Sequence, residues 1–175
     1  SRCITLTIPP NSDKEADSFL ANHELSRQKV SRVLLNSGGS LGIVLDSLQN
    51  TEDFNLSAMT LVRWLRFLYS KDLKQTLQWS EEMASKTREE IRIFLIFSIT
   101  VFRQTAHLNH NSLTVPPFEY DTFDVKKFSP FVKPEDMPAI LSCLQNCLND
   151  VLRNGNSKAV LLDTSLQLFK YVGQA

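Results

Sequence analysis

The stretch TREEIRIFLIFSITVF (Thr87–Phe102) decides the fold class. Thr87 and Glu90 have the T-x-x-E spacing of a capping box, in which each residue satisfies a backbone N–H of the other at the start of a helix. From Ile91 onward the helix is apolar nearly all round, and such a helix is normally the buried centre of a bundle. The apolar run Ile93–Phe102 is about half of the ~20 residues that a bilayer-spanning helix needs, so we predict no membrane span.

The spacing of apolar residues predicts four further helices around this one, which gives about five helices over residues 51–175. Asp72 is expected to cap the second helix, and Pro134 to open the fourth, which Gly155 ends. The predicted core residues outside the central helix are Leu56, Met59, Val62, Trp64, Leu65, Phe67 and Leu68, then Leu73, Leu77 and Met83, then Ile140, Leu144, Cys147, Leu148 and Val151, and finally Leu161, Leu162, Leu166, Phe169 and Val172.

Helical periodicity fails between Asn109 and Lys133. Prolines and aromatic residues dominate there, and they predict an ordered crossing that is pinned by aromatic rings rather than a flexible linker. These residues are Pro116, Pro117, Phe118, Tyr120, Phe123, Phe128, Pro130 and Phe131.

The first 50 residues carry a different pattern. In SRCITLTIPP (residues 1–10), isoleucine and leucine alternate with threonine and proline, which is the period of a half-buried strand. Residues 11–50 predict three short helices, the first opened by a capping box at Ser12 and the second ended by Gly38-Gly39. The polar run Gln49–Asp53 is expected to be a linker. We therefore predict an all-α protein of about eight helices in two units, with the opening strand as the exception.

Composition limits the class of protein. The 19 basic and 19 acidic residues give a net charge of zero, so there is no general attraction to nucleic acid or to a membrane surface. Three cysteines fit reduced thiols better than a disulfide framework. Arg2 stands alone, and Pro9 and Pro10 interrupt any apolar core, so the start of the chain does not resemble a signal peptide. We predict a soluble cytoplasmic protein.

Two pairs of residues are candidates for metal chemistry. His107 and His110 are three apart on a helix, but metal sites in bundles pair histidine with carboxylates as Glu-x-x-His, and here Gln104 takes that place. The histidines are expected instead to complement carbonyls at a helix end. Cys143 and Cys147 lie four apart on an apolar face without further nearby ligands for zinc, so we expect them to be small core residues.

No nucleophile elbow and no P-loop pattern occurs in the sequence. The Gly38-Gly39-Ser40 turn before a helix could hold a phosphate, but it lacks the lysine and the spacing of a P-loop. The sequence therefore predicts no self-contained active site, no cofactor and no metal.

Three stretches in fixed order resemble one family. They are SRC before a strand (residues 1–3), GGSLGIVLDSL in the short helical unit (residues 38–48), and FSPFVKPEDMPAILSCLQNCLNDVLRNGNSKAVLLDTSLQLF (residues 128–169). Together they resemble the clamp loader subunits of bacterial DNA polymerase III, most of all the delta-prime subunits. The resemblance implies that residues 1–10 are the last strand of an AAA+ core lying upstream, that residues 11–50 are the lid, and that residues 51–175 are the collar.

The resemblance also implies roles for single residues. Arg2 would be an arginine finger, which stabilises charge on the ATP of a neighbouring subunit. Gly42 stands where ATP-binding subunits carry an arginine, and this favours delta-prime over the gamma/tau motor subunit, so we expect no ATPase activity. The implied partners are gamma/tau and delta, with the sliding clamp and primed DNA reached only through the full complex. Because neighbours in a ring meet head to tail, Gln167, Lys170 and Tyr171 near the C-terminus are our interface candidates.

Two other classes of protein remain open from the residues themselves. A freestanding all-α regulatory domain that binds a small ligand would explain the helices and the aromatic crossing, although not the opening strand. A metal-dependent bundle enzyme would rest on the two histidines alone.

Overall fold

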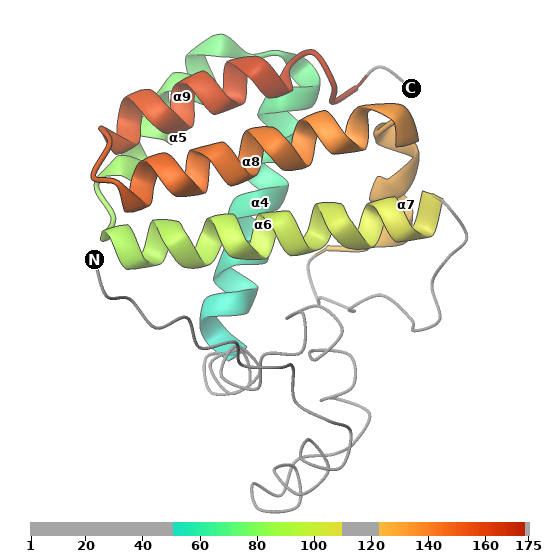
Figure 1. Cartoon of the computed structure of the whole chain (residues 1–175), viewed down its shortest axis with the longest axis horizontal. Coiled ribbons are helices and arrows are strands. Elements are labelled where there is room, and N and C mark those ends of the chain that lie inside the picture. Colours follow the sequence, from blue (N-terminus) through green and yellow to red (C-terminus); the bar gives the residue numbers. More distant parts are fainter. Residues whose placement is uncertain (1–50, 110–122, 174–175) are drawn as a thin grey trace, which may run out of the picture. The chain divides into compact units, whose positions relative to one another are not determined.

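In a computed structural model of the chain, residues 51–109 and 123–173 are described, and they are all-α, as predicted. All of them except Thr51 belong to one compact unit, Glu52–Ala175. The predicted strand and lid (residues 1–50) and the first half of the crossing (residues 110–122) lie outside the described residues. The helices are α4 (Thr51–Ser70), α5 (Leu73–Ala84), α6 (Arg88–Asn109), α7 (Val125–Phe128), α8 (Met137–Leu152) and α9 (Ser157–Leu168), with 3₁₀ turns η1 (Ser129–Phe131) and η2 (Pro134–Asp136) (Figure 1).

The predicted helix starts in the middle of the chain are confirmed. The Asp72 side chain caps α5 by accepting a hydrogen bond from the backbone N–H of Gln75 at 3.0 Å. At the start of α6 the capping box is complete: the backbone N–H of Thr87 donates to Glu90 Oε2 at 2.8 Å, and that of Glu90 donates to Thr87 Oγ1 at 3.2 Å. These hydrogen bonds are local, which is why the sequence alone can predict them.

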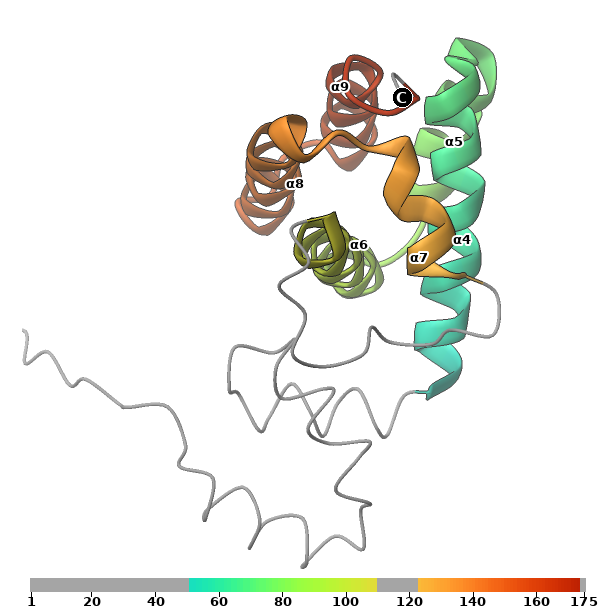
Figure 2. The ribbon, with the colours of Figure 1, turned by 90° about the vertical axis from the view of Figure 1, so that its right-hand side faces the viewer.

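Helix α6 is the buried centre of the bundle, as predicted. Each of its residues from Ile91 to Phe102 is buried or half-buried. Helix α6 lies alongside α8 (Figure 1). The end-on view in Figure 2 shows α4, α5 and α7 on the side of α6 that is opposite to α8. By length and composition α6 could cross a membrane, but more than half of its most apolar window is buried inside the bundle, which is typical of a core helix.

The predicted core faces of α4, α5 and α9 are wrong in part. Leu56 and Met59 of α4 are exposed, as are Leu73 and Leu77 of α5 and Leu166 of α9. The faces that pack inward contain tryptophans and many small or hydroxyl-bearing residues, which a search for large aliphatic residues misses. They are Ala58, Leu61, Trp64, Leu65 and Leu68 in α4, Thr76, Trp79, Ser80 and Met83 in α5, and Leu161, Thr164, Ser165 and Leu168 in α9.

An aromatic cluster joins four helices in the core. The rings of Trp64 and Trp79 are stacked, with centroids 4.9 Å apart and planes 5° from parallel, and Phe94 of α6 packs against both at 5.7 Å. Trp64 Nε1 donates a hydrogen bond to Ser165 Oγ of α9 at 2.9 Å. The indole N–H of Trp79 is equally buried but has no hydrogen-bond partner in the described part of the chain.

The second half of the crossing is ordered by aromatic residues, as predicted, but it also contains a helix that the pattern did not predict. Asp124 caps the four-residue helix α7 by accepting hydrogen bonds from the N–H groups of Lys126 and Lys127. Phe128 is buried and packs edge-on against Phe102, with centroids 5.6 Å apart. Phe131 is instead substantially exposed.

The start and end of α8 differ from the prediction. Pro134 opens the 3₁₀ turn η2, and α8 itself begins at Met137. The residue in the left-handed conformation after α8 is Asn154, with φ of 67°, rather than Gly155. Gly155 donates its N–H to the Asp150 carbonyl at 2.8 Å, and a Cβ on Gly155 would lie only 2.8 Å from that oxygen. The glycine is therefore required by a close backbone approach.

The end of the described chain is held against the segment before α8. Val172 pairs with Val132 in an isolated antiparallel bridge, and the N–H of Gly173 donates to the Phe131 carbonyl at 3.3 Å. Gly173 has a φ of 85°, and a Cβ there would approach the Tyr69 ring to 2.9 Å. Tyr69 in turn packs edge-on against Phe131.

Candidate functional site

The interface candidates do not form one helix face. Helix α9 ends at Leu168, so that Gln167 alone of the three belongs to it, and Lys170 and Tyr171 lie in the turns that follow. Lys170 is exposed, whereas Tyr171 is half-buried and packs against the core. The predicted arginine finger, Arg2, lies outside the described residues, as do Gly42 and His110.

Gln167 is directed toward α8. Its amide nitrogen donates to Asp163 Oδ2 at 2.7 Å, and its Oε1 accepts a contact from Cys143 Sγ at 3.5 Å. The side chain is therefore engaged within the bundle surface, and it is separated from Lys170 by the end of α9. Gln167 therefore lies in α9 and the other two candidates lie beyond it, and their role in an interface stays a prediction.

A groove of about 640 Å³ lies between α8 and α9. Its lining is mainly polar and includes the two buried thiols. Arg153, which caps the end of α8, stands among its charged residues together with Asp150 and Asp163. The lining residues are Cys143, Asn146, Cys147, Asn149, Asp150, Arg153, Ala159, Val160, Asp163, Thr164 and Gln167. Sequence reasoning missed this groove because it depends on how two helices pack.

The two thiols are buried and free, as predicted. Burial, together with the nearby Asp163 carboxylate, raises the pKa of Cys143 from the ordinary 9.0 to about 11. Burial also raises the pKa of Cys147 to about 11, although a hydrogen bond with Thr164 acts in the opposite direction. Thiols with such pKa values stay protonated at neutral pH and are poor nucleophiles and metal ligands. Within the described residues, no group of three or more His, Cys, Asp or Glu side chains could hold a metal ion.

Alkylation should reveal this protection directly. At pH 8, iodoacetamide is expected to label Cys143 and Cys147 in the native chain at least about 100-fold more slowly than in urea-unfolded chain, because a pKa raised by two units lowers the thiolate fraction about 100-fold. Peptide mass spectrometry separates these two cysteines from Cys3. Equal labelling rates in the two states would contradict the buried positions.

The same raised pKa values make stability depend on pH. The unfolded thiols ionise near pH 9 and the folded ones near pH 11, so their contribution to the free energy of unfolding is complete below pH 9. It is lost as the pH rises from 9 to 11, because only the unfolded state gains from releasing the protons in that range.

No protein-family model, no curated protein and no solved structure matches this chain.

Proposed function

We propose that this chain is the C-terminal part of a bacterial clamp loader subunit, most similar to delta-prime. Its described bundle would be the collar through which the subunit joins gamma/tau and delta in an ATP-dependent ring. This ring places the sliding clamp on primed DNA, and the whole complex acts in the cytoplasm. Arg2 would serve as an arginine finger toward a neighbour's ATP, and the chain itself would bind no nucleotide.

One observation carries the proposal. The stretch that contributes most to the resemblance, residues 128–169, forms the paired helices α8 and α9 inside an all-α bundle, as a collar requires. The described residues also contain no cluster of groups suited to metal chemistry, and their two thiols are poor nucleophiles.

Reconstitution tests this proposal. The full chain is mixed with the gamma/tau and delta subunits encoded in the same genome and analysed by gel filtration with light scattering. We expect one complex that contains all three proteins. If the chain elutes alone at micromolar concentrations while the other two associate, the proposal is wrong.

A second candidate function is favoured by the groove between α8 and α9. The groove, of about 640 Å³, is open to solvent, and its polar sides would suit a small polar ligand. This would make the bundle a ligand-binding regulatory domain. A small polar compound that raises the melting temperature of the chain by several degrees would support it, provided that Asp163→Ala abolishes the effect.

A further inference from the structure

Helices α5 and α9 share an exposed apolar surface, which we call the α5–α9 seam. It consists of Leu73 and Leu77 from α5, of Leu162 and Leu166 from α9, and of Phe169, which follows the end of α9. The exposed fractions of Leu73, Leu77 and Leu166 are 56%, 38% and 40%, and Leu162 and Phe169 are half-buried. Residues four apart on a helix lie on one face, so each helix contributes a short apolar stripe.

Two contacts show that the two helices run side by side. Near the end of α5, Glu81 Oε1 lies 2.6 Å from Lys158 Nζ at the start of α9. Near the start of α5, Tyr69 lies close to Gly173, which follows the end of α9. The two helices therefore pack antiparallel, and this orientation places Leu73 beside the end of α9 and Leu77 beside its middle.

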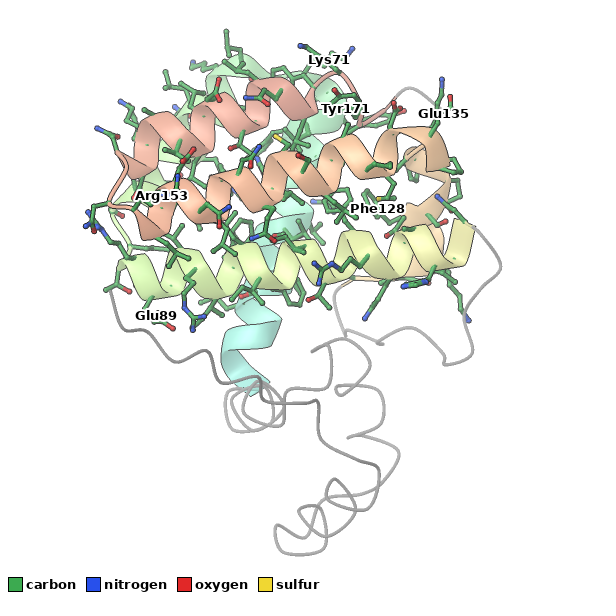
Figure 3. All side chains as sticks on the ribbon, in the orientation of Figure 1. Lys71, Glu89, Phe128, Glu135, Arg153 and Tyr171 are labelled. Carbon is green, nitrogen blue, oxygen red and sulfur yellow. The ribbon has the colours of Figure 1, made fainter. Side chains whose placement is uncertain are left out.

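The two ends of the seam differ in charge. Lys71, Lys74 and Lys170 are exposed at the end where α5 begins, and none of them forms an ion pair within the described residues. Figure 3 shows Lys71 and Tyr171 at this same end of the bundle. At the opposite end the carboxylates are already paired: Glu81 with Lys158, and Glu82 with Arg63. The seam is thus an apolar strip with three exposed lysines at one end, where the Asp72 carboxylate that caps α5 also lies.

We propose that the α5–α9 seam binds one amphipathic helix from a neighbouring gamma/tau subunit, with its apolar face against the leucines and carboxylates against the lysines. This inference rests on the proposed function and identifies the surface that serves it. Spaced leucines on two adjacent helices suit the apolar face of a third helix. Exposed leucines that are contiguous, unlike scattered ones, mark interaction surfaces. The exposed lysines at one end of the seam favour a partner helix with carboxylates at the end that lies beside them. This preference would fix the direction in which the partner helix runs along the seam.

The test uses the full chain and the gamma/tau subunit from the same genome, with binding followed by biolayer interferometry. Leu73→Ser with Leu166→Ser is expected to weaken binding at least about tenfold, because buried central anchors carry most of the affinity of an interface. The matched control is Leu152→Ser, which changes an equally exposed leucine (57%) at the end of α8, outside the seam. The control should bind like the wild type, and circular dichroism should show all variants folded.

Charge reversal provides a second, independent arm. Lys74→Glu with Lys170→Glu should slow association several-fold at low salt and flatten the dependence of the association rate on ionic strength. These side chains are exposed, so loss of folding would not account for the effect.

The outcomes distinguish the inference from the function on which it rests. If the wild type binds gamma/tau and the seam variants bind equally well, the inference is wrong and the proposed function stands. If the wild type does not bind, both are wrong. If sedimentation shows a dimer of the chain that the double-serine variant dissociates, the seam is occupied by a second copy, and the assignment to gamma/tau is overturned.

Discussion

Replacing Trp64 with alanine is expected to lower the free energy of unfolding by about 3–5 kcal/mol, the usual cost of removing a large aromatic side chain from a core. Trp64 is fully buried and stacks on Trp79 while its ring edge contacts Phe94. The alanine would leave a cavity between α4, α5 and α6 that neighbouring side chains fill only in part. Urea unfolding followed by circular dichroism at 222 nm measures the loss.

A matched pair of milder variants separates packing from hydrogen bonding. Trp64→Phe loses ring area and the hydrogen bond to Ser165 Oγ, whereas Trp79→Phe loses similar area but removes an N–H that has no partner. Trp64→Phe should therefore cost about 1 kcal/mol more than Trp79→Phe. Ser165→Ala, which leaves the Trp64 N–H buried and unpaired, should itself cost about 1–3 kcal/mol. An equal or larger cost for Trp79→Phe would contradict this account of the cluster.

Replacing Gln104 with methionine is expected to stabilise the protein by about 1–3 kcal/mol. The Gln104 side chain is almost completely buried in α6, and among the described residues neither its amide nitrogen nor its amide oxygen has a hydrogen-bond partner. Folding therefore removes both polar atoms from water without compensation. Methionine has nearly the same length and flexibility and no such cost.

The adjacent exposed position supplies the control for this stabilisation. Arg103→Met changes a solvent-facing residue of the same helix and should alter stability by no more than about 0.5 kcal/mol. Thermal and urea unfolding of both variants beside the wild type give the comparison. If Gln104→Met destabilises the chain, the amide has a partner in solution that matters for folding.

The sequence predicts best those features of the fold that depend on residues within one helical turn of each other. The capping box of Thr87 and Glu90 and the Asp72 cap depend on residues three apart, so their geometry follows from the sequence itself. The burial of α6 was also predictable, because a helix apolar nearly all round has no face suited to water. Helix α7 was missed because four residues are too few to show a helical period.

What the sequence could not decide is which of several apolar faces packs inward. Leu73 and Leu77 have the spacing of a core stripe, yet α5 buries Trp79 and its small neighbours because the stacked partner, Trp64, comes from another helix. The expectation that one C-terminal helix carries all three interface candidates was wrong for a related reason. Helix α9 stops at Leu168, before Lys170 and Tyr171, where the chain turns to pair Val172 with Val132. Such contacts join residues far apart in the sequence, and a local sequence pattern cannot predict them.

The stacked indoles also give the chain a built-in optical reporter. Its two tryptophans are Trp64 and Trp79, so the tryptophan emission of the whole chain arises from one cluster in the bundle. Two indoles 4.9 Å apart and nearly parallel are positioned for coupled electronic transitions, which would give the folded bundle a distinctive near-ultraviolet circular dichroism. Tryptophan emission therefore reports the separation of α4, α5 and α6 on unfolding. It carries no direct signal from residues 1–50, so an introduced fluorophore would be needed to follow those residues in the same experiment.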